Sequence, residues 1–330
     1  MITKQKKLPS VEDILQISPL PARLAERKKS FDGMLAENMR SRNRFVVVAG
    51  PCSADDATAV GEYCQRLHAS RQKYGNLLLV ARIYTSKPHS NGVGYKGLCF
   101  QHDVNSAVDL AQGIVAGRQL MINTLETGLP IADELLYPDL FPYFADLVSY
   151  WFVGARSAED SLHRGIASMT DVCCGIKNAT NGLVESAEQS LFAVAHPCVF
   201  PFGGCQTETS GNSLAHIVLR GGLGKEGFFS NISPYDTQKA KKLLQSQHLN
   251  DFVMVDLSHA NSKKVAKNQL VNAVAVSTDA NVDGVMAESY LFEGCSANSY
   301  GVSKTDECIG WQDTEKLLEI LSDGFSKRAK

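Results

Sequence analysis

The sequence lacks several features that would assign its 330 residues to particular protein classes. No run approaches the roughly 18 apolar residues of a membrane-spanning helix, and the N-terminal stretch has no apolar segment typical of a secretion signal. Basic residues are not in excess, because 33 Lys and Arg stand against 35 Asp and Glu. We therefore expect neither a membrane protein nor a general nucleic-acid binder.

Cysteine does not form a disulfide framework either. The chain has nine cysteines, an odd number without regular spacing. Reduced thiols in a cytoplasmic protein fit this pattern best. What the chain does have is 44% hydrophobic and 21% charged residues, enough to bury a sizeable core.

Apolar, β-rich runs alternate with helical patterns along most of the chain. The strand-like runs cover residues 45–49, 77–84, 129–135, 150–155, 172–177, 216–219, 252–257 and 284–287. Strands that alternate with helices, for example 103–121 and 237–245, indicate βαβ units and a parallel sheet. Eight runs suit an α/β protein of the (β/α)8 TIM-barrel class, so we predict a catalytic barrel over 43–330. The residues before the first run, 1–42, are predicted to form an N-terminal arm.

Polar residues lie at or just after the carboxyl ends of these eight runs. In chain order they are Cys52, Arg82, Lys87, Glu134, Arg156, Lys177, Arg220, His259 and Glu288. In a barrel, all these ends open onto one face, which holds the active site. A doubly wound sheet would gather such residues only at a switch point, so the barrel predicts one site built from all of them.

Four residues of this set and the last loop form a candidate metal site: Cys52, His259, Glu288 and Asp306. A thiolate, an imidazole and two carboxylates suit one divalent ion such as Mn, Fe, Co or Zn. Taken singly they have ordinary explanations, Cys52 as a buried thiol, His259 as a loop histidine and Asp306 as a helix cap. Their joint placement at one end of the barrel favours the metal.

A second set consists of cations: Arg82, Lys87, Lys96, Arg156, Lys177 and Arg220. Most Lys and Arg residues are solvated surface charges, which is the alternative here. Several of these, however, end or follow apolar strands, where a role confined to the surface is less expected. Six cations in a nearly neutral protein predict a substrate with several phosphate or carboxylate charges.

One motif points elsewhere and is rejected. Residues 92–97 match the G-x-G-x-x-G pattern of dinucleotide-binding proteins. That fingerprint must directly follow a strand, open a helix and precede an acidic residue by about 20 positions. Here seven residues separate Tyr84 from Gly92, and the helix is expected only near Asp103. A nicotinamide oxidoreductase is therefore not favoured.

Long strings of sequence resemble one enzyme family over nearly the whole chain. They include GPCSADD at 50–56, ARIYTSKP at 81–88, GIKNATNG at 175–182, DLSHANSKK at 256–264 and KTDECIGWQDT at 304–314. In this order they resemble type I 3-deoxy-D-arabino-heptulosonate 7-phosphate (DAHP) synthases, the feedback-regulated kind. That family condenses phosphoenolpyruvate with erythrose 4-phosphate in the first step of the shikimate route.

The resemblance also implies residue roles. It implies that the divalent metal is held by Cys52, His259, Glu288 and Asp306, so that Cys52 and His259 also count as catalytic. It implies that phosphoenolpyruvate is bound by Arg82, Arg156, Lys177 and Arg220. Lys87 is then the proton donor, and Lys96 and Glu134 are further substrate-binding candidates. A homodimer or homotetramer is expected from the family.

The chain departs from the family in the loop that receives the aldehyde. Family members usually carry Lys-Pro-Arg-Thr there, whereas this chain has Lys87-Pro88-His89-Ser90-Asn91 and one extra residue before Gly94. An imidazole, largely neutral at pH 7, replaces the guanidinium that binds the aldehyde's phosphate. His89 and Ser90 remain candidate substrate-binding residues, but the acceptor aldehyde is left open.

A second departure concerns regulation. In regulated members, the segment equivalent to 195–212 forms a hairpin before the sixth strand that helps to bind an inhibitory aromatic amino acid. Here it is about five residues shorter by comparison with the family pattern and carries Pro201 and Phe202.

The alternatives to a DAHP synthase are a paralogue that uses another aldehyde and a non-catalytic regulatory homologue. The second is disfavoured because all metal ligands and donor-binding cations are retained.

Overall fold

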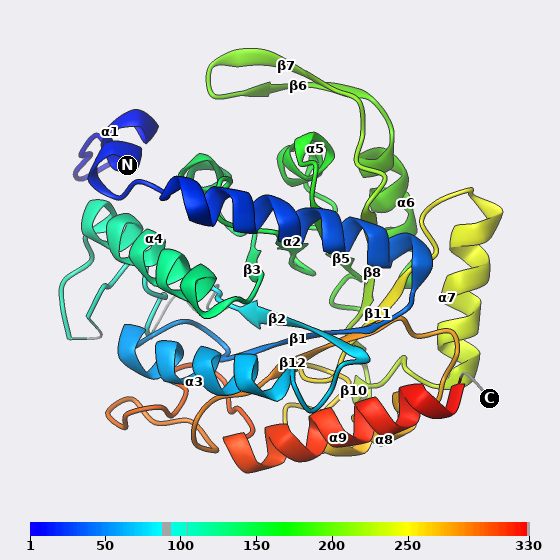
Figure 1. Ribbon diagram of the computed structural model, residues 1–330. Helices are drawn as coiled ribbons and strands as arrows, with labels where there is room; N and C mark the ends of the chain where they lie inside the picture. The colour runs from blue at the N-terminus through cyan, green and yellow to red at the C-terminus, as the bar shows by residue number, and fades with distance from the viewer. Residues whose placement is uncertain (88–93, 104, 329–330) are drawn as a thin grey trace.

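The computed structural model describes residues 1–87, 94–103 and 105–328 of the chain. Within these residues, eight parallel strands close into a barrel in the order β1-β12-β11-β8-β5-β4-β3-β2. Helices lie around the barrel, and helices and strands alternate along the chain (Figure 1). The predicted (β/α)8 barrel is therefore confirmed.

The barrel strands match the predicted runs to within a few residues. They are β1 (Phe45–Gly50), β2 (Leu77–Arg82), β3 (Ile131–Glu134), β4 (Tyr150–Val153), β5 (Cys173–Lys177), β8 (Ala215–Leu219), β11 (Val253–Asp256) and β12 (Gly284–Glu288). β1 pairs in parallel with both β2 and β12, which closes the barrel. The strands are almost wholly buried, as expected for a parallel sheet covered by helices.

Aspartates cap the first turns of the helices that follow several strands. Asp56 caps α3 (Ala57–Ser70), Asp109 caps α4 (Leu110–Thr127) and Asp160 caps α5 (Ser161–Met169) by accepting backbone N–H bonds. The prediction that the helix after β2 begins near Asp103 was wrong. It begins at Leu110 because the Asp109 carboxylate satisfies the free amides of Ala111 and Gln112.

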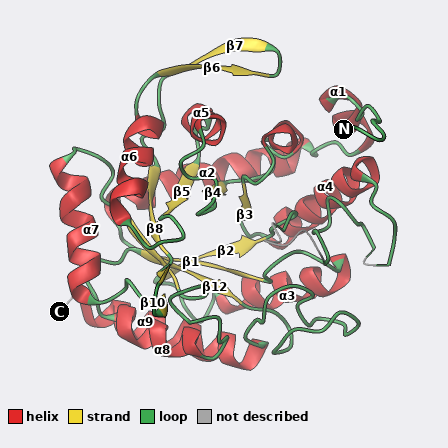
Figure 2. Ribbon diagram, turned by 180° about the vertical axis from the view of Figure 1, so that it is seen from behind, coloured by secondary structure: helices red, strands yellow, loops and turns green. Residues whose placement is uncertain are grey.

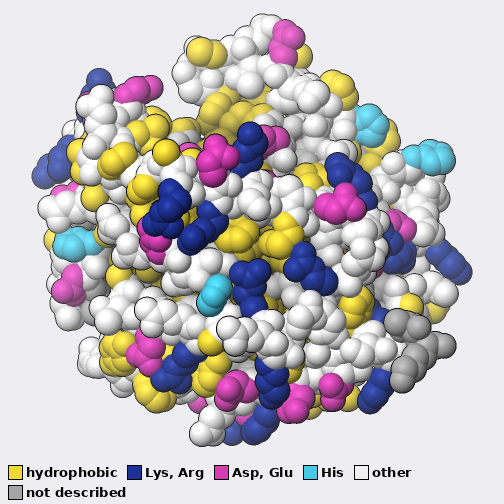
Figure 3. Space-filling model, viewed as in Figure 1, with side chains coloured by type: hydrophobic (Ala, Val, Ile, Leu, Met, Phe, Trp, Pro, Cys, Tyr) yellow, Lys and Arg dark blue, Asp and Glu magenta, His cyan; other side chains and the backbone are white. Residues whose placement is uncertain are grey.

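Two helices precede the barrel, α1 (Val11–Ile17) and α2 (Ala22–Ser41). Leu35 and Met39 of α2 pack with barrel residues such as Val46 and Phe252, so α2 covers the end of the barrel where the strands begin. In Figure 3 the outer face over α2 carries Lys and Arg side chains interspersed with Asp and Glu.

A buried arginine connects the chain around α1 to the barrel. The Arg118 side chain, on α4, donates to the carbonyl of Ser18 and makes a two-point contact with Asp146. Its burial is complete, so the guanidinium depends on these protein partners rather than on water.

The hairpin expected before the sixth barrel strand is present. It consists of β6 (Cys198–Phe202) and β7 (Cys205–Thr209), which pair antiparallel and project away from the barrel (Figure 2). The Phe200 ring sits where a side chain on Gly165 of α5 would collide with it. The Phe202 ring lies 6.4 Å from that of Phe141, and hydrophobic side chains gather just below the hairpin in Figure 3.

The remaining elements complete the outer layer. They are η1 (Pro138–Tyr143), α6 (Val184–Ala195), β9 (Gly222–Gly224), β10 (Gly227–Phe229), α7 (Pro234–Ser246), α8 (Asn268–Ser277) and α9 (Trp311–Arg328). The helix predicted at 237–245 lies within α7. Among the described residues, none of the helices is both long and apolar enough to cross a membrane.

Candidate active site

A cavity of about 350 Å³ opens at the carboxyl ends of the barrel strands. It is large enough for a small charged substrate pair. Its wall combines most of the predicted cations with carboxylates and a histidine. The predicted residues in the wall are Arg82, Lys87, Glu134, Arg156, Lys177, Arg220, His259 and Asp306.

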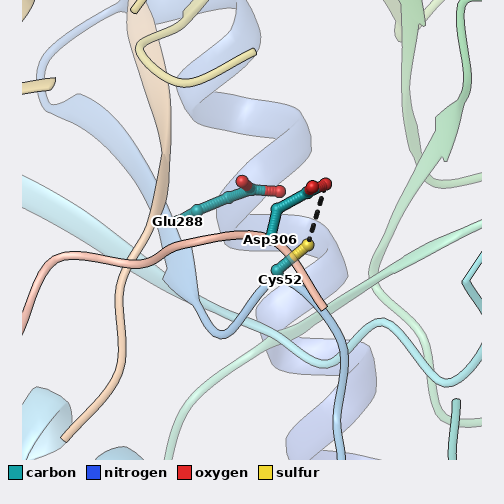
Figure 4. Close-up of side chains that lie close together, drawn as sticks. All are labelled: Cys52, Glu288 and Asp306. Atoms are coloured by element: carbon teal, nitrogen blue, oxygen red, sulfur yellow. Dashed lines mark hydrogen bonds between the residues drawn. The ribbon is translucent and has the colours of Figure 1, made fainter. Parts of the chain in front are cut away.

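Three of the four predicted metal ligands converge on one point beside this cavity, and one of them, Asp306, lies in its wall. Cys52 follows β1, Glu288 ends β12 and Asp306 lies in the loop before α9, yet their ligand atoms all lie within 4.8 Å of one another. Figure 4 shows the three side chains pointing toward a common centre. The Cys52 Sγ is 3.6 Å from an Asp306 carboxylate oxygen.

The Lys87 ammonium contacts this group. Its Nζ lies 2.7 Å from Cys52 Sγ and 2.8 Å from Asp306 Oδ2. Burial opposes the charge, but the neighbouring Cys52, Glu288 and Asp306 raise the pKa of Lys87 above its ordinary value. The side chain is therefore an ammonium at neutral pH, with a proton to give.

The fourth predicted ligand, His259, borders the same cavity and is oriented by its neighbours. Its Nδ1 lies 2.8 Å from Asp256 Oδ2 and 2.8 Å from Ser258 Oγ. Nε2 is then the nitrogen available to a metal, in the arrangement by which carboxylates orient metal-binding histidines. His259 has a left-handed backbone, with φ of 51°, which places it on a tight turn after β11.

Asp256 holds two site residues at once. Besides His259, it pairs with Lys177, whose Nζ is 3.2 Å from Asp256 Oδ2, and both side chains are buried. Burial works against ionisation, yet the charges of His259 and Lys177 keep the pKa of Asp256 well below its usual range. The carboxylate therefore stays charged and fixes Lys177 at the cavity wall.

Arg82 is fixed from several sides. Its guanidinium donates to the carbonyls of Pro51 and Cys52 and lies 3.1 Å from Glu288 Oε1. It also lies over the Tyr84 ring, with Cζ 3.7 Å from the ring centroid, a cation–π contact. A side chain at Gly50 would collide with the Arg82 backbone, so only glycine allows this close approach of β1.

The other cations frame the cavity from neighbouring strands. Arg156 follows β4 and Arg220 follows β8, and burial lowers the pKa of Arg220 from its ordinary high value. Glu134, which ends β3, packs so closely that a side chain on Gly154 would meet its carboxylate. A cavity with fixed guanidinium and ammonium groups can bind a substrate that carries both phosphate and carboxylate.

Three predicted substrate-binding residues are not placed in this wall. His89 and Ser90 lie outside the described residues. Lys96 is half-buried and its carbonyl accepts a bond of 2.9 Å from Lys87 N. Within the described chain, its side chain is not part of the cavity wall.

Sequence reasoning missed three residues that belong to the site: Asp256, Tyr84 and Lys264. Asp256 gave a signal, since a carboxylate interrupts the apolar run 252–257. Tyr84 gave none, because a tyrosine at the end of an apolar run is ordinary. Lys264 lines the cavity 3.9 Å from Asp306 Oδ1, on a turn that only the folded chain brings there.

The residues present fit a divalent metal. A thiol and two carboxylates meet at one point, and a cation, the Lys87 ammonium, contacts two of them. Burial and the Glu288 carboxylate raise the pKa of the Cys52 thiol to about 11. Since a bound divalent ion strongly favours the thiolate, the donor set suits a borderline metal rather than Mg or Ca.

Comparison with known proteins agrees with this geometry. Residues 37–319 match the model of the DAHP synthetase I family. A phospho-2-dehydro-3-deoxyheptonate aldolase of Haemophilus influenzae is 38% identical, with 87% of this chain and 83% of the relative covered. The Phe-sensitive enzyme of Escherichia coli is 35% identical, covering 92% and 89%.

The similarity extends to a solved three-dimensional structure. The phospho-2-dehydro-3-deoxyheptonate aldolase of Francisella tularensis superposes with a TM-score of 0.93 at 31% identity and covers 99% of both chains. The matches span the barrel and all the cavity residues named above. The chain therefore belongs to the DAHP synthetase I family, as a 3-deoxy-7-phosphoheptulonate synthase or a close paralogue of one.

Proposed function

We propose that this chain condenses phosphoenolpyruvate with erythrose 4-phosphate, giving DAHP and inorganic phosphate, the first step of the shikimate pathway. The observation that carries the proposal is one cavity in which paired cations adjoin a Cys52–Glu288–Asp306 cluster. The family relation supports the same reaction.

Phosphoenolpyruvate is assigned to Arg82, Arg156, Lys177 and Arg220. These cations come from four different strand ends, so they can contact the carboxylate and the phosphate of one small molecule together. Arg82 and Lys177 are held by Glu288 and Asp256, which supports a preorganised site for the charge that shifts during reaction. Glu134 is assigned to the part of the cavity wall that binds phosphoenolpyruvate.

In the proposed reaction, C3 of phosphoenolpyruvate attacks the aldehyde carbon, and water adds at C2 with loss of one proton. The C2–O bond to phosphate then breaks as the new C2 hydroxyl loses its proton and becomes the ketone. Lys87 Nζ gives its proton to the former aldehyde oxygen. A divalent ion held by Cys52, His259, Glu288 and Asp306 would supply Lewis-acid polarisation of the aldehyde. Asp256 orients His259 through Nδ1, and Lys87 stays protonated beside the thiol and carboxylates until transfer.

A second acceptor is favoured by one observation, the His89-Ser90-Asn91 string in place of the family's Arg-Thr. Neutral polar groups bind hydroxyls well but give a phosphate dianion little charge. Exchange of a charge-assisted bond for a neutral one loses about 1 kcal/mol or more. The alternative is therefore a DAHP-synthase-like enzyme that uses a different aldehyde in specialised metabolism.

A panel of aldehydes offered with phosphoenolpyruvate tests both versions. The loss of phosphoenolpyruvate ultraviolet absorbance reports turnover, and mass spectrometry identifies the product. We expect erythrose 4-phosphate to be used less efficiently than by family members. A low micromolar KM for it, with no better aldehyde, would favour the standard acceptor. Absence of turnover with every aldehyde would contradict the proposal.

Assembly and location belong to the proposal as well. We expect a homodimer or a homotetramer, which analytical ultracentrifugation will distinguish from a monomer. All nine cysteines, which lie within the described residues, are free thiols. This supports the cytoplasmic location expected from the sequence.

A further inference from the structure

Asp133 is a buried carboxylate that the proposed reaction does not use. Its side chain is 2% exposed and lies on β3 beside Glu134. Because side chains alternate along a strand, Glu134 faces the cavity whereas Asp133 faces the helix layer, near Leu140, Phe144 and Trp151. A carboxylate among apolar side chains is unfavourable unless it is fully hydrogen-bonded, so its partners indicate what it does.

The Asp133 carboxylate accepts three hydrogen bonds, and two of them come from Thr85, which lies beyond the end of β2. Asp133 Oδ1 accepts from Thr85 N at 3.1 Å and from Glu134 N at 2.7 Å. Asp133 Oδ2 accepts from the Thr85 hydroxyl at 2.8 Å. The side chain therefore ties Thr85, itself buried, to β3.

These bonds lie where the pairing of β2 with β3 stops. The ladder continues as far as Ile83 N, which donates to Ala132 O at 2.8 Å. In a regular parallel ladder the next amide, Thr85 N, would donate to Glu134 O. That carbonyl instead accepts from Leu136 N at 2.9 Å. The Asp133 carboxylate accepts from Thr85 N in place of that carbonyl, and the chain therefore leaves the sheet in a defined direction.

The direction matters because Lys87 comes two residues later. Thr85 O accepts from Cys99 N at 3.0 Å, and Lys87 N donates to Lys96 O at 2.9 Å, so segments 85–87 and 96–99 are joined. Lys87 then extends its Nζ to Cys52 Sγ and Asp306. Asp133 fixes the start of this path.

We propose that Asp133 and Thr85 form a positioning pair that places Lys87 Nζ for proton transfer to the aldehyde. The inference rests on the proposed function for its substrates. Neither residue lines the cavity, so both act through Lys87. Of the donor-binding cations, Arg156, Lys177 and Arg220 belong to other strands. The fourth, Arg82, ends β2, but its guanidinium is held by Pro51, Cys52 and Glu288 and not by the pair. Loss of the pair therefore impairs the acceptor half of the reaction and spares phosphoenolpyruvate binding.

Four variants test this, in matched pairs. Asp133→Ala removes all three bonds, whereas Asp133→Asn can keep them, because its amide oxygen accepts both N–H groups and its nitrogen donates to the Thr85 hydroxyl. Thr85→Val removes only the hydroxyl bond, and Thr85→Ser keeps it. Since a displacement of about 1 Å costs roughly a hundredfold in rate, we expect Asp133→Ala to lower kcat/KM for erythrose 4-phosphate by about ten- to a hundredfold, and Thr85→Val by less.

The phosphoenolpyruvate dissociation constant, measured by calorimetry, should be unchanged in all four variants, and Asp133→Asn and Thr85→Ser should retain parental kcat/KM. A parallel loss of phosphoenolpyruvate affinity would overturn the proposal, because it indicates general disruption. So would a folded Asp133→Ala enzyme with parental kcat/KM. If Asp133→Ala does not fold, Thr85→Val decides, with thermal melting as the check on folding.

Amide hydrogen exchange separates this inference from the proposed function. If the parent enzyme turns over no aldehyde, the proposed function fails, but the pair is still testable. Faster exchange at Lys87 and Cys99 in Asp133→Ala or Thr85→Val, and not in Asp133→Asn or Thr85→Ser, supports the pair. Equal exchange in all four variants overturns it.

Discussion

The two ends of the barrel interior bury polar groups in opposite ways. Where β8 begins, His216 Nε2 lies 2.8 Å from the Tyr150 hydroxyl, and burial lowers the pKa of His216 to about 4. That pair is neutral at pH 7. Where the strands end, Lys177 faces Asp256 and Arg82 faces Glu288, and all four side chains are buried and charged.

The difference lies in the neighbours and not in the degree of burial. His216 touches aromatic rings, including Phe252 with centroids 5.1 Å apart, and desolvation lowers its pKa by more than the hydrogen bond to the Leu214 carbonyl raises it. At the other end, each charge has an opposite charge beside it, and the cavity opens there. Lys177, Asp256, Arg82 and Glu288 thus stay charged because each has an oppositely charged partner, at the end where the cavity can meet a charged substrate.

The largest effect is expected from removal of Cys52. Cys52→Ala deletes one of the three converging ligands, so metal binding at unit stoichiometry and nearly all activity should be lost. Chelation of the parent enzyme should have the same result, with recovery on addition of Mn, Co or Fe. Metal analysis and turnover are the measurements, and Cys205→Ser, on the exposed hairpin, is the control. Full activity in metal-free parent protein would contradict the metal site.

Donor binding at the charged end is tested by Arg156→Ala and Arg220→Ala, two arginines of the cavity wall. Each should lose a charge-assisted contact with phosphoenolpyruvate, about 1.5–3 kcal/mol, or roughly 10- to 150-fold in affinity by calorimetry. Arg40→Ala, on the exposed end of α2, should leave affinity unchanged. Unaltered affinity in both cavity variants would show that these arginines do not bind the donor.

His216→Leu tests the neutral end. At pH 7 it should lower the free energy of unfolding by about 1–3 kcal/mol, because the buried Tyr150 hydroxyl loses its partner. The folded state disfavours a proton on His216, so the parent loses stability as pH falls from about 6.5 toward 4, by about 1.4 kcal/mol per pH unit.

The variant should lack that acid-side loss. Urea unfolding at pH 7, 5.5 and 4.5 measures it, with His102→Gln, at an exposed histidine, as the control. If the free energy of unfolding of His216→Leu fell as steeply between pH 6.5 and 4 as that of the parent, another group would be responsible for the acid-side loss.

The smallest effect concerns the hairpin, which lies outside both ends of the barrel. Phe200 fills the space over Gly165, and Phe202 packs on Phe141, so aromatic side chains of the protein occupy this region. We expect Phe, Tyr and Trp to inhibit weakly or not at all, although a relative is named Phe-sensitive. Activity assays with each amino acid check this, and inhibition at micromolar concentration would refute it.

The order of strands and helices could be predicted from the sequence, because each barrel strand is a short apolar run bounded by polar residues. The convergence of Cys52, Glu288 and Asp306 could be predicted too, since a barrel brings all strand ends to one face. The start of α4 could not. Whether Asp103 or Asp109 caps the helix depends on how segment 94–103 packs, and both are acceptable capping residues.

The sequence by itself therefore determined the barrel, its family and the set of charged residues at one end. Only the tertiary structure decided which carboxylate serves which partner. Asp133 and Asp256 each end or nearly end a buried strand, yet Asp256 pairs with Lys177 and His259, whereas Asp133 turns outward and holds Thr85. The physical reason is that the side a strand residue faces depends on register, and the partner it meets comes from a different strand.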